Sequence, residues 1–318
     1  MKKLDFIFDT DVGADCDDMM ALTYLVYAKK HFNIVLKAVT HSRNDINGVP
    51  AIRAFFRTLG EDIPDIGRMS GELVEYKSYA KAIADRFCIE DDFSKCDDAV
   101  KVLRRALCNS EVAVLCAVGP FTNIAALLES GADEISELDG VSLVKARCSK
   151  VVVMAGQFVL NKSGELCPEW NVKCDVRAAK IIAEKCPVPL VFLPFETGEG
   201  IMTGIPIVER YGEATPLSMS FVKFGAVPSV GGRHSWDPAT VVYAVEGVGE
   251  CFEESPRGTV TVDEIGRTVM KYDDNGLHSI LTVRSIDGES EHESKKRVAS
   301  YIDACADEVY DNFTHRES

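Results

Sequence analysis

Five aspartates crowd the stretch DTDVGADCDD (9–18), which directly follows the apolar run LDFIF (4–8). Carboxylates this close together repel one another unless a cation lies among them or water screens their charges. A set of ligands that are all oxygen atoms suits a hard cation such as Ca²⁺ or Mg²⁺ better than zinc. Alternatively, Asp17 and Asp18 only cap a following helix and complement its dipole. Capping needs one or two acidic residues, however, and leaves the other three aspartates unexplained.

Two known cation-binding patterns can be compared with this stretch. An EF-hand loop needs Gly at its sixth position and Glu at its twelfth, and neither Asp9 nor Asp11 as first residue supplies both. Phosphatases of the haloacid-dehalogenase type also place a D-x-D after their first strand, with the first Asp as nucleophile and Mg²⁺ beside it. Their motif has Thr or Val two residues after the second Asp, where this chain has Gly13. A phosphatase with Asp9 as nucleophile is therefore the alternative enzyme.

The elements that position these residues follow from hydrophobic periodicity, since short apolar runs alternate with helical patterns. The pattern predicts strands at 4–8, 34–40, 112–118, 150–156 and 188–194. It predicts helices at 17–30, 50–59, 98–109, 120–130 and 175–185. Strands that are apolar on both faces and are separated by helices indicate a mostly parallel, open α/β sheet with helices on both faces. Ligands gather at the carboxyl ends of such strands, where Asp9 and Asp11 follow the first one.

The last hundred residues have a different pattern. They predict a helix at 236–247, a small antiparallel excursion at 258–284 with DDNG as a turn, and a closing helix at 295–313. The chain shows no internal repeat, low-complexity tract or linker. We therefore expect one domain that spans residues 1–318.

Composition limits the partners and the compartment. A net charge of −15 argues against nucleic acid and anionic membrane surfaces, which need basic patches. No apolar segment approaches the ~20 residues that span a bilayer. The eleven cysteines show no CxxC spacing and the start has no secretory pattern, so we expect reduced thiols and a cytoplasmic protein.

Four segments resemble the inosine–uridine-preferring nucleoside hydrolase family. They are FDTDVGADCDDMMAL, VGPFTNIAALL, PEWNVKCDVRAA and WDPATVVYAV, and they occur in the family's order between residue 4 and about residue 247. The resemblance implies hydrolysis of the N-glycosidic bond of a ribonucleoside, through an oxocarbenium-like state, to ribose and free base. It further implies bound Ca²⁺, a small-molecule nucleoside substrate and a role in nucleoside metabolism such as purine salvage. It also allows a homo-oligomer.

The resemblance assigns roles to the acidic residues. Asp11 would be the general base and a metal ligand, with Asp18, Asp237 and the main-chain carbonyl of Val118 as further ligands. Asp237 has an alternative reading, because an Asp followed by Pro238 is also a favourable helix start. Asp15 stands in a turn that is two residues longer than the family's, and either coordinates through water or caps that turn.

The resemblance also implies a set of substrate-binding residues that would contact the ribose. They are Asp17, Met154, Glu169 and Asn171, with Asn161 and Ser163 as the nearest candidates for a further, displaced family asparagine, of which we take Asn161. Trp170, between two of them, is expected in the core.

Activation of the leaving base is where the chain departs from the family. Pyrimidine-capable members have a His immediately before the late Asp, where this chain has Trp236. An aromatic residue there resembles the purine-preferring members, in which stacking raises the basicity of the base, so Trp236 is the candidate catalytic residue on the base side. His41, His234 and His278 are expected to be structural rather than general acids. Without a histidine acid, a catalytically impaired ribose- or nucleoside-binding protein is the non-enzymatic alternative.

Overall fold

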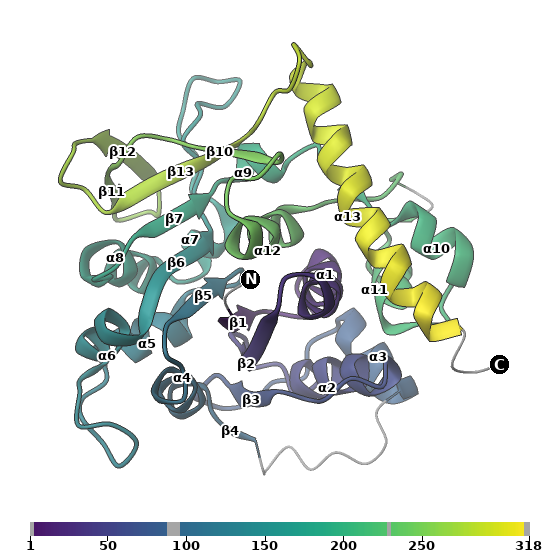
Figure 1. Cartoon of the computed structure of the whole chain (residues 1–318), viewed down its shortest axis with the longest axis horizontal. Coiled ribbons are helices and arrows are strands. Elements are labelled where there is room, and N and C mark those ends of the chain that lie inside the picture. The colour runs from purple at the N-terminus through teal and green to yellow at the C-terminus, as the bar shows by residue number, and fades with distance from the viewer. Residues whose placement is uncertain (1–2, 88–95, 228–229, 315–318) are drawn as a thin grey trace.

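The structure, a computed structural model, describes residues 3–87, 96–227 and 230–314. One large sheet runs through the molecule with helices on both of its faces (Figure 1). Its eleven strands are β1 (Leu4–Thr10), β2 (Ile34–His41), β3 (Asp65–Arg68), β4 (Asp97–Asp98), β5 (Ala113–Ala117), β6 (Cys148–Met154), β7 (Leu190–Leu193), β10 (Phe252–Glu254), β11 (Gly258–Val262), β12 (Thr268–Tyr272) and β13 (His278–Val283). Their order is β12-β11-β13-β7-β6-β5-β1-β2-β3-β4, with β10 beside β13. A separate two-stranded sheet joins β8 (Met202–Thr203) to β9 (Arg233–His234).

All five strands expected from the apolar runs are present and neighbouring ones are parallel, which confirms the predicted fold class. β1 lies between β2 and β5, and β6 lies between β5 and β7. Phe6 and Phe8 point into one core cluster and Ile7 into the other, and all three side chains are fully buried. Burial on both faces explains the continuous apolar run, because each such side chain contributes about 1.5–3 kcal/mol when it leaves water.

Helices form a layer on each face. The core cluster around Phe6 is shared by α1 (Asp17–His31), α2 (Gly48–Thr58), α3 (Tyr79–Phe87), α10 (Ile205–Tyr211), α11 (Pro216–Phe224), α12 (Trp236–Glu246) and α13 (Glu291–Thr314). The cluster around Ile7 is shared by α4 (Ala99–Cys108), α5 (Thr122–Glu129), α6 (Gly140–Arg147), α7 (Trp170–Cys174) and α8 (Val176–Lys185). A short helix, α9 (Phe195–Gly198), follows β7. None of the helices in these described ranges combines the length and apolar composition that a membrane span requires.

The C-terminal region confirms the antiparallel excursion and extends it. β11 and β12 pair antiparallel, and the DDNG turn that follows β12 is closed by a hydrogen bond from the Gly276 nitrogen to the Asp273 oxygen. β13 then pairs antiparallel with β11 and parallel with β7, which joins this excursion to the rest of the main sheet. The closing helix α13 begins at Glu291, four residues before the predicted start. Ser290 and Glu293 exchange hydrogen bonds between side chain and backbone, a capping box that explains the earlier start.

Candidate active site

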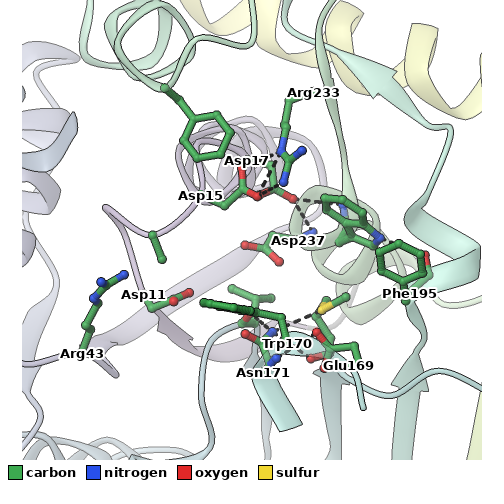
Figure 2. Close-up of a pocket in the computed structure, with 15 residues that line it drawn as sticks. Asp11, Asp15, Asp17, Arg43, Glu169, Trp170, Asn171, Phe195, Arg233 and Asp237 are labelled. Carbon is green, nitrogen blue, oxygen red and sulfur yellow. Dashed lines mark hydrogen bonds and ion pairs between the residues drawn. The ribbon is translucent and has the colours of Figure 1, made fainter. Parts of the chain in front are cut away.

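The carboxyl ends of β1, β5 and β6 meet the N-termini of α1, α7 and α12 around one pocket of about 480 Å³ (Figure 2). Its lining is mainly acidic, aromatic and cationic: Asp11, Ala14, Asp15, Asp17, Arg43, Val118, Met154, Glu169, Trp170, Asn171, Phe195, Phe224, Arg233, Trp236 and Asp237. All but two of the site residues expected from the sequence are in this lining. The exceptions are Asp18, which lies buried beneath it, and Asn161.

Three buried carboxylates form the floor of the site. One oxygen from each of Asp17, Asp18 and Asp237 lies within 4.8 Å of the others. Burial, followed by repulsion among neighbouring aspartates, raises the pKa of each of these carboxyls well above its ordinary value. At an effective dielectric constant of ~20, two ionised carboxylates about 5 Å apart repel by roughly 3 kcal/mol. The cluster is therefore costly when ionised unless a cation joins it.

The turn between β1 and α1 brings these groups together. One oxygen of Asp18 accepts hydrogen bonds from the Thr10 hydroxyl and, at 3.1 Å, from the Asp11 nitrogen. Gly13 has a φ of +111°, and a Cβ there would lie 3.1 Å from the Ala80 Cβ. A Thr or Val, as the phosphatase motif has there, would be strained at this position.

A hard cation fits this donor set. The second oxygen of Asp18 is buried and accepts no hydrogen bond from the described residues, which leaves its lone pairs available. The three carboxylates offer only oxygen atoms, which Ca²⁺ and Mg²⁺ prefer. Val118 lines the same pocket, and its carbonyl accepts a hydrogen bond at 2.7 Å from the Asn171 side chain.

Asp11 lies in the pocket beside this cluster. Burial raises its pKa to about 7, and Asp15 and Asp9 add to the rise, whereas the positive charge of Arg43 opposes it. A carboxyl that titrates near neutral pH can take a proton from water under ordinary conditions. Asp11 is thus chemically suited to act as a base.

The second polar group of the site comes from the start of α7. Glu169 caps this helix, because its carboxylate accepts hydrogen bonds from the backbone nitrogens of Asn171 at 2.9 Å and Val172 at 3.2 Å. Burial raises the pKa of Glu169 to about 7. Asn171 donates from its side chain to the carbonyls of Val118 at 2.7 Å and Met154 at 3.2 Å. These contacts tie α7 to the ends of β5 and β6.

Aromatic residues close another side of the pocket. Trp236 stacks on Phe195, with ring centroids 5.5 Å apart, and its indole nitrogen donates to the Phe195 carbonyl at 2.8 Å. We call this pair the aromatic wall. Trp170 was expected in the core, but its side chain is 65% exposed and lines the pocket. The expectation was wrong because Val172 and not Trp170 fills the core position of this short helix.

Asp15, the unassigned acid of the long turn, forms an ion pair with Arg233. The Nε of Arg233 lies 2.8 Å from Oδ1 of Asp15, which also accepts a hydrogen bond from the Cys16 nitrogen at 2.7 Å. Sequence reasoning missed Arg233, together with Arg43 and Phe195. Their positions in the sequence were the available signal. Arg43 and Phe195 lie within three residues of a strand end, and Arg233 lies three residues before Trp236.

Several other candidates are placed outside the pocket lining. The Asn161 side chain accepts hydrogen bonds from the Ser163 and Glu165 nitrogens within its own loop. The candidate histidines make contacts with backbone groups: His41 with the Val12 oxygen, His234 with the Gly200 nitrogen and His278 with the Val260 nitrogen.

The phosphatase alternative is not favoured. Its nucleophile would be Asp9, whose side chain is fully buried beneath the pocket. One oxygen of Asp9 accepts hydrogen bonds from the Thr40 hydroxyl and, at 2.8 Å, from the Asn123 side chain. Asp9 therefore supports the turn and is not presented to a substrate.

Comparison with known proteins identifies the family and the fold of this chain. The family model of the inosine-uridine preferring nucleoside hydrolases matches residues 6–308. An inosine-uridine preferring nucleoside hydrolase from Bacillus anthracis is 18% identical, with 94% of this chain and 99% of that chain covered and a TM-score of 0.65. A plant nucleoside hydrolase is 18% identical, with 95% and 98% covered and a TM-score of 0.69. A purine-preferring ribonucleoside hydrolase from Gardnerella vaginalis is 18% identical, with 95% and 99% covered and a TM-score of 0.68.

No curated protein sequence matches the chain significantly. The solved structures, at such low identity, show the fold, whereas the family model matches the sequence itself over nearly the whole chain. The chain therefore belongs, as a divergent member, to the inosine-uridine preferring nucleoside hydrolase family of enzymes, which hydrolyse the N-glycosidic bond of ribonucleosides.

Proposed function

We propose that this chain hydrolyses the N-glycosidic bond of ribonucleosides, with some preference for purines, and that it uses Ca²⁺. The observation that carries the proposal is the cluster of Asp17, Asp18 and Asp237, which lies next to Asp11 at the floor of a pocket with an aromatic wall. A cation site, a base and an aromatic surface are the three elements that such a reaction needs.

The ion would be held by Asp11, Asp18, Asp237 and the main-chain carbonyl of Val118. Asp17, although it belongs to the same cluster of carboxylates, would bind the ribose. Calcium rather than magnesium is proposed, because Ca²⁺ tolerates flexible sets of six to eight oxygen ligands. When bound, it would supply Lewis-acid chemistry that lowers the pKa of a nearby water molecule.

Asp11 would take the proton from the attacking water, since its carboxyl lies in the pocket and is buried. As the glycosidic bond breaks, positive charge develops on the ribose ring. The surrounding carboxylates would stabilise that charge electrostatically, because they are held in place before the reaction begins.

The ribose would be oriented by groups that already have fixed positions. Asp17 is held by hydrogen bonds at 3.0 Å from the Trp236 and Asp237 nitrogens. Glu169 and Asn171 are held by the start of α7, and Met154 lies beside Asn171, with its sulfur 3.2 Å from the amide nitrogen. Asn161 is not part of the proposed site, because its side chain accepts a hydrogen bond from the Ser163 nitrogen within its own loop.

The departing base would lie against the aromatic wall. Trp236 and Phe195 both line the pocket, and contact with this wall would make the base easier to protonate. The described lining contains no histidine that could donate the proton directly. This arrangement supports purines over pyrimidines, since the larger base makes the larger stacking contact.

One experiment separates this enzyme from a binding protein. The purified chain with Ca²⁺ is incubated with a panel of ribonucleosides and with p-nitrophenyl riboside, and release of reducing sugar is followed. We expect release from purine nucleosides and from the activated riboside. Ribose binding without release from any compound would show that the chain is a catalytically impaired binding protein instead.

We further propose that residues 1–318 form one nucleoside hydrolase-like domain that acts on small molecules in the cytoplasm, as a homo-oligomer. The shared core clusters support a single domain, and the net charge of −15 supports a small-molecule substrate rather than nucleic acid. The cysteine pattern supports the cytoplasm. Light scattering on the purified chain tests the oligomeric state.

A further inference from the structure

The pocket of this acidic protein contains two guanidinium groups, from Arg43 and Arg233. They differ in their partners. Arg233 forms a two-pronged ion pair with Asp15 and lies over the rings of Trp236 and Phe224, so its charge is neutralised. Arg43 forms no ion pair with any described carboxylate within 4.0 Å. Arg43 is thus the cation of this lining that has no carboxylate of the described residues within 4.0 Å, although its charge acts on nearby Asp11.

Arg43 is nevertheless held in place. It stands two residues after the end of β2, and its guanidinium lies 4.1 Å from the centre of the Tyr76 ring. The Tyr76 hydroxyl donates to the Asn44 side chain at 3.0 Å, which fixes the ring. A cation that is stacked on an aromatic ring loses little conformational freedom when it binds a ligand.

Arg43 lies on the side of the pocket where a bound ribosyl compound would place the end of its sugar opposite the base. Figure 2 shows Arg43 and Phe195 on opposite sides of Asp237, with Asp11 on the Arg43 side. When the sugar lies over the carboxylates and its base lies against the aromatic wall, the substituent on the other end of the sugar points toward Arg43. A neutral hydroxyl at that end would gain little from a guanidinium, whereas an anion would have its charge compensated by one.

We propose that Arg43 binds a phosphoryl group carried by the sugar, so that the substrates of this chain include phosphorylated ribosyl compounds. The inference rests on the proposed function, because it uses the same pocket and the same orientation of the sugar. A phosphate that enters a pocket lined by aspartates is repelled by them unless a cation compensates. Arg provides that cation with a planar fork that matches two phosphate oxygens.

A binding measurement tests the inference without any turnover. Dissociation constants for ribose and ribose 5-phosphate are measured by calorimetry with Ca²⁺ present. We expect ribose 5-phosphate to bind about tenfold more tightly than ribose, as a charge-assisted contact provides. Equal or weaker binding of ribose 5-phosphate would overturn the inference, even where nucleosides are hydrolysed.

The variant Arg43→Gln tests the residue. It should abolish the preference for ribose 5-phosphate, whereas Arg43→Lys should keep part of it, since the charge remains and the fork is lost. Arg86→Gln is the matched control, because the Arg86 guanidinium also lies over an aromatic ring, 5.3 Å from the centre of Phe87, but outside the pocket lining. A preference that survives Arg43→Gln would overturn the assignment.

A kinetic comparison separates phosphate binding from an effect on Asp11, which lies near the charge of Arg43. The ratio of kcat/KM for inosine 5′-monophosphate to that for inosine should fall about tenfold in Arg43→Gln and stay constant in Arg86→Gln. Equal losses on both substrates would mean that Arg43 acts through Asp11 and would overturn the inference. Inosine 5′-diphosphate as a third substrate shows whether a monoester or a diphosphate is preferred. Where none of these compounds is cleaved, the proposed function fails and the ribose 5-phosphate binding result still decides the inference.

Discussion

The carboxylate of Asp17 accepts a hydrogen bond at 3.0 Å from the backbone nitrogen of Asp237, although 220 positions separate the two residues. The contact joins the first turn of α1 to the first turn of α12. It also brings their side chains within reach of one cation, together with Asp18. Neither end of the chain can form this site alone, so metal binding and the folded state should depend on each other.

Removal of the cation should destabilise the protein in a pH-dependent way. Burial and mutual repulsion raise the pKa of Asp17, Asp18 and Asp237, so the cation-free folded state gains stability as falling pH protonates them and is least stable when they are ionised. Calcium at about 100 times its dissociation constant adds ~2.7 kcal/mol. We expect EDTA to lower the Tm, measured by scanning calorimetry, by several degrees at pH 8 and by much less at pH 5.

The control for this measurement is Asp18→Asn, which removes one ligand and one repelling charge. The Tm of this variant should respond weakly to EDTA at both pH values. An equal response of the original chain at pH 5 and pH 8 would contradict a carboxylate-bound cation.

Asp11→Asn should abolish turnover and preserve the fold. An amide of the same shape cannot accept the proton of the attacking water, and loss of a general base typically lowers kcat by about 10²–10⁴. Release of reducing sugar measures kcat, and the Tm reports the fold. Asp263→Asn, at a half-buried aspartate next to β11 and outside the pocket lining, is the matched control and should keep full activity. Retained activity in Asp11→Asn would refute Asp11 as the base.

Trp236→Leu should discriminate between substrates by their leaving groups. It removes the stack on Phe195 and the hydrogen bond to the Phe195 carbonyl, so a natural base loses its aromatic partner. We expect kcat on inosine to fall about 100-fold, at the lower end of one acid–base contribution. The rate on p-nitrophenyl riboside should change little, because nitrophenolate leaves without protonation. Equal losses on both substrates would assign Trp236 a structural role.

Asp303 should make stability depend on pH at a place outside the pocket lining. Burial raises its pKa from 3.8 to about 7, while a hydrogen bond from the Gly204 nitrogen at 2.9 Å opposes the rise. The folded state therefore binds this proton more tightly than the unfolded state, and its contribution to stability grows as pH falls from about 7 toward 4 and is lost above 7. Each pH unit in that window changes the free energy of unfolding by at most ~1.4 kcal/mol.

Asp303→Asn keeps the acceptor for Gly204 and removes the charge. Urea unfolding at pH 8 and pH 4.5 should show a stability gain for the variant only at pH 8. A gain of the same size at both pH values would mean that ionisation of Asp303 is not the cause.

Local sequence determined several features before any tertiary contact was known. The apolar run of β1, buried on both faces, and the alternation of strands with helices were sufficient to predict the parallel sheet. The apolar run Leu4–Phe8 located β1, although the strand continues through Asp9 and Thr10 before the rest of the acidic turn follows at its carboxyl end. The sequence did not predict shorter elements such as β3, α7 and α9, because four or five residues are too few for hydrophobic periodicity to distinguish a helix from a strand.

Only the tertiary structure decided which side chains of the candidate site meet. Trp170 is exposed and Asp9 is buried, although local sequence indicated the reverse for the first and left the second open as a nucleophile. The partner of Asp15 is Arg233, 218 positions later, and no periodicity links them. The physical reason is that burial and charge pairing depend on which distant elements pack together. Chemical type and spacing along the chain determine what a residue can do, and packing determines whether it faces a substrate, a cation or the core.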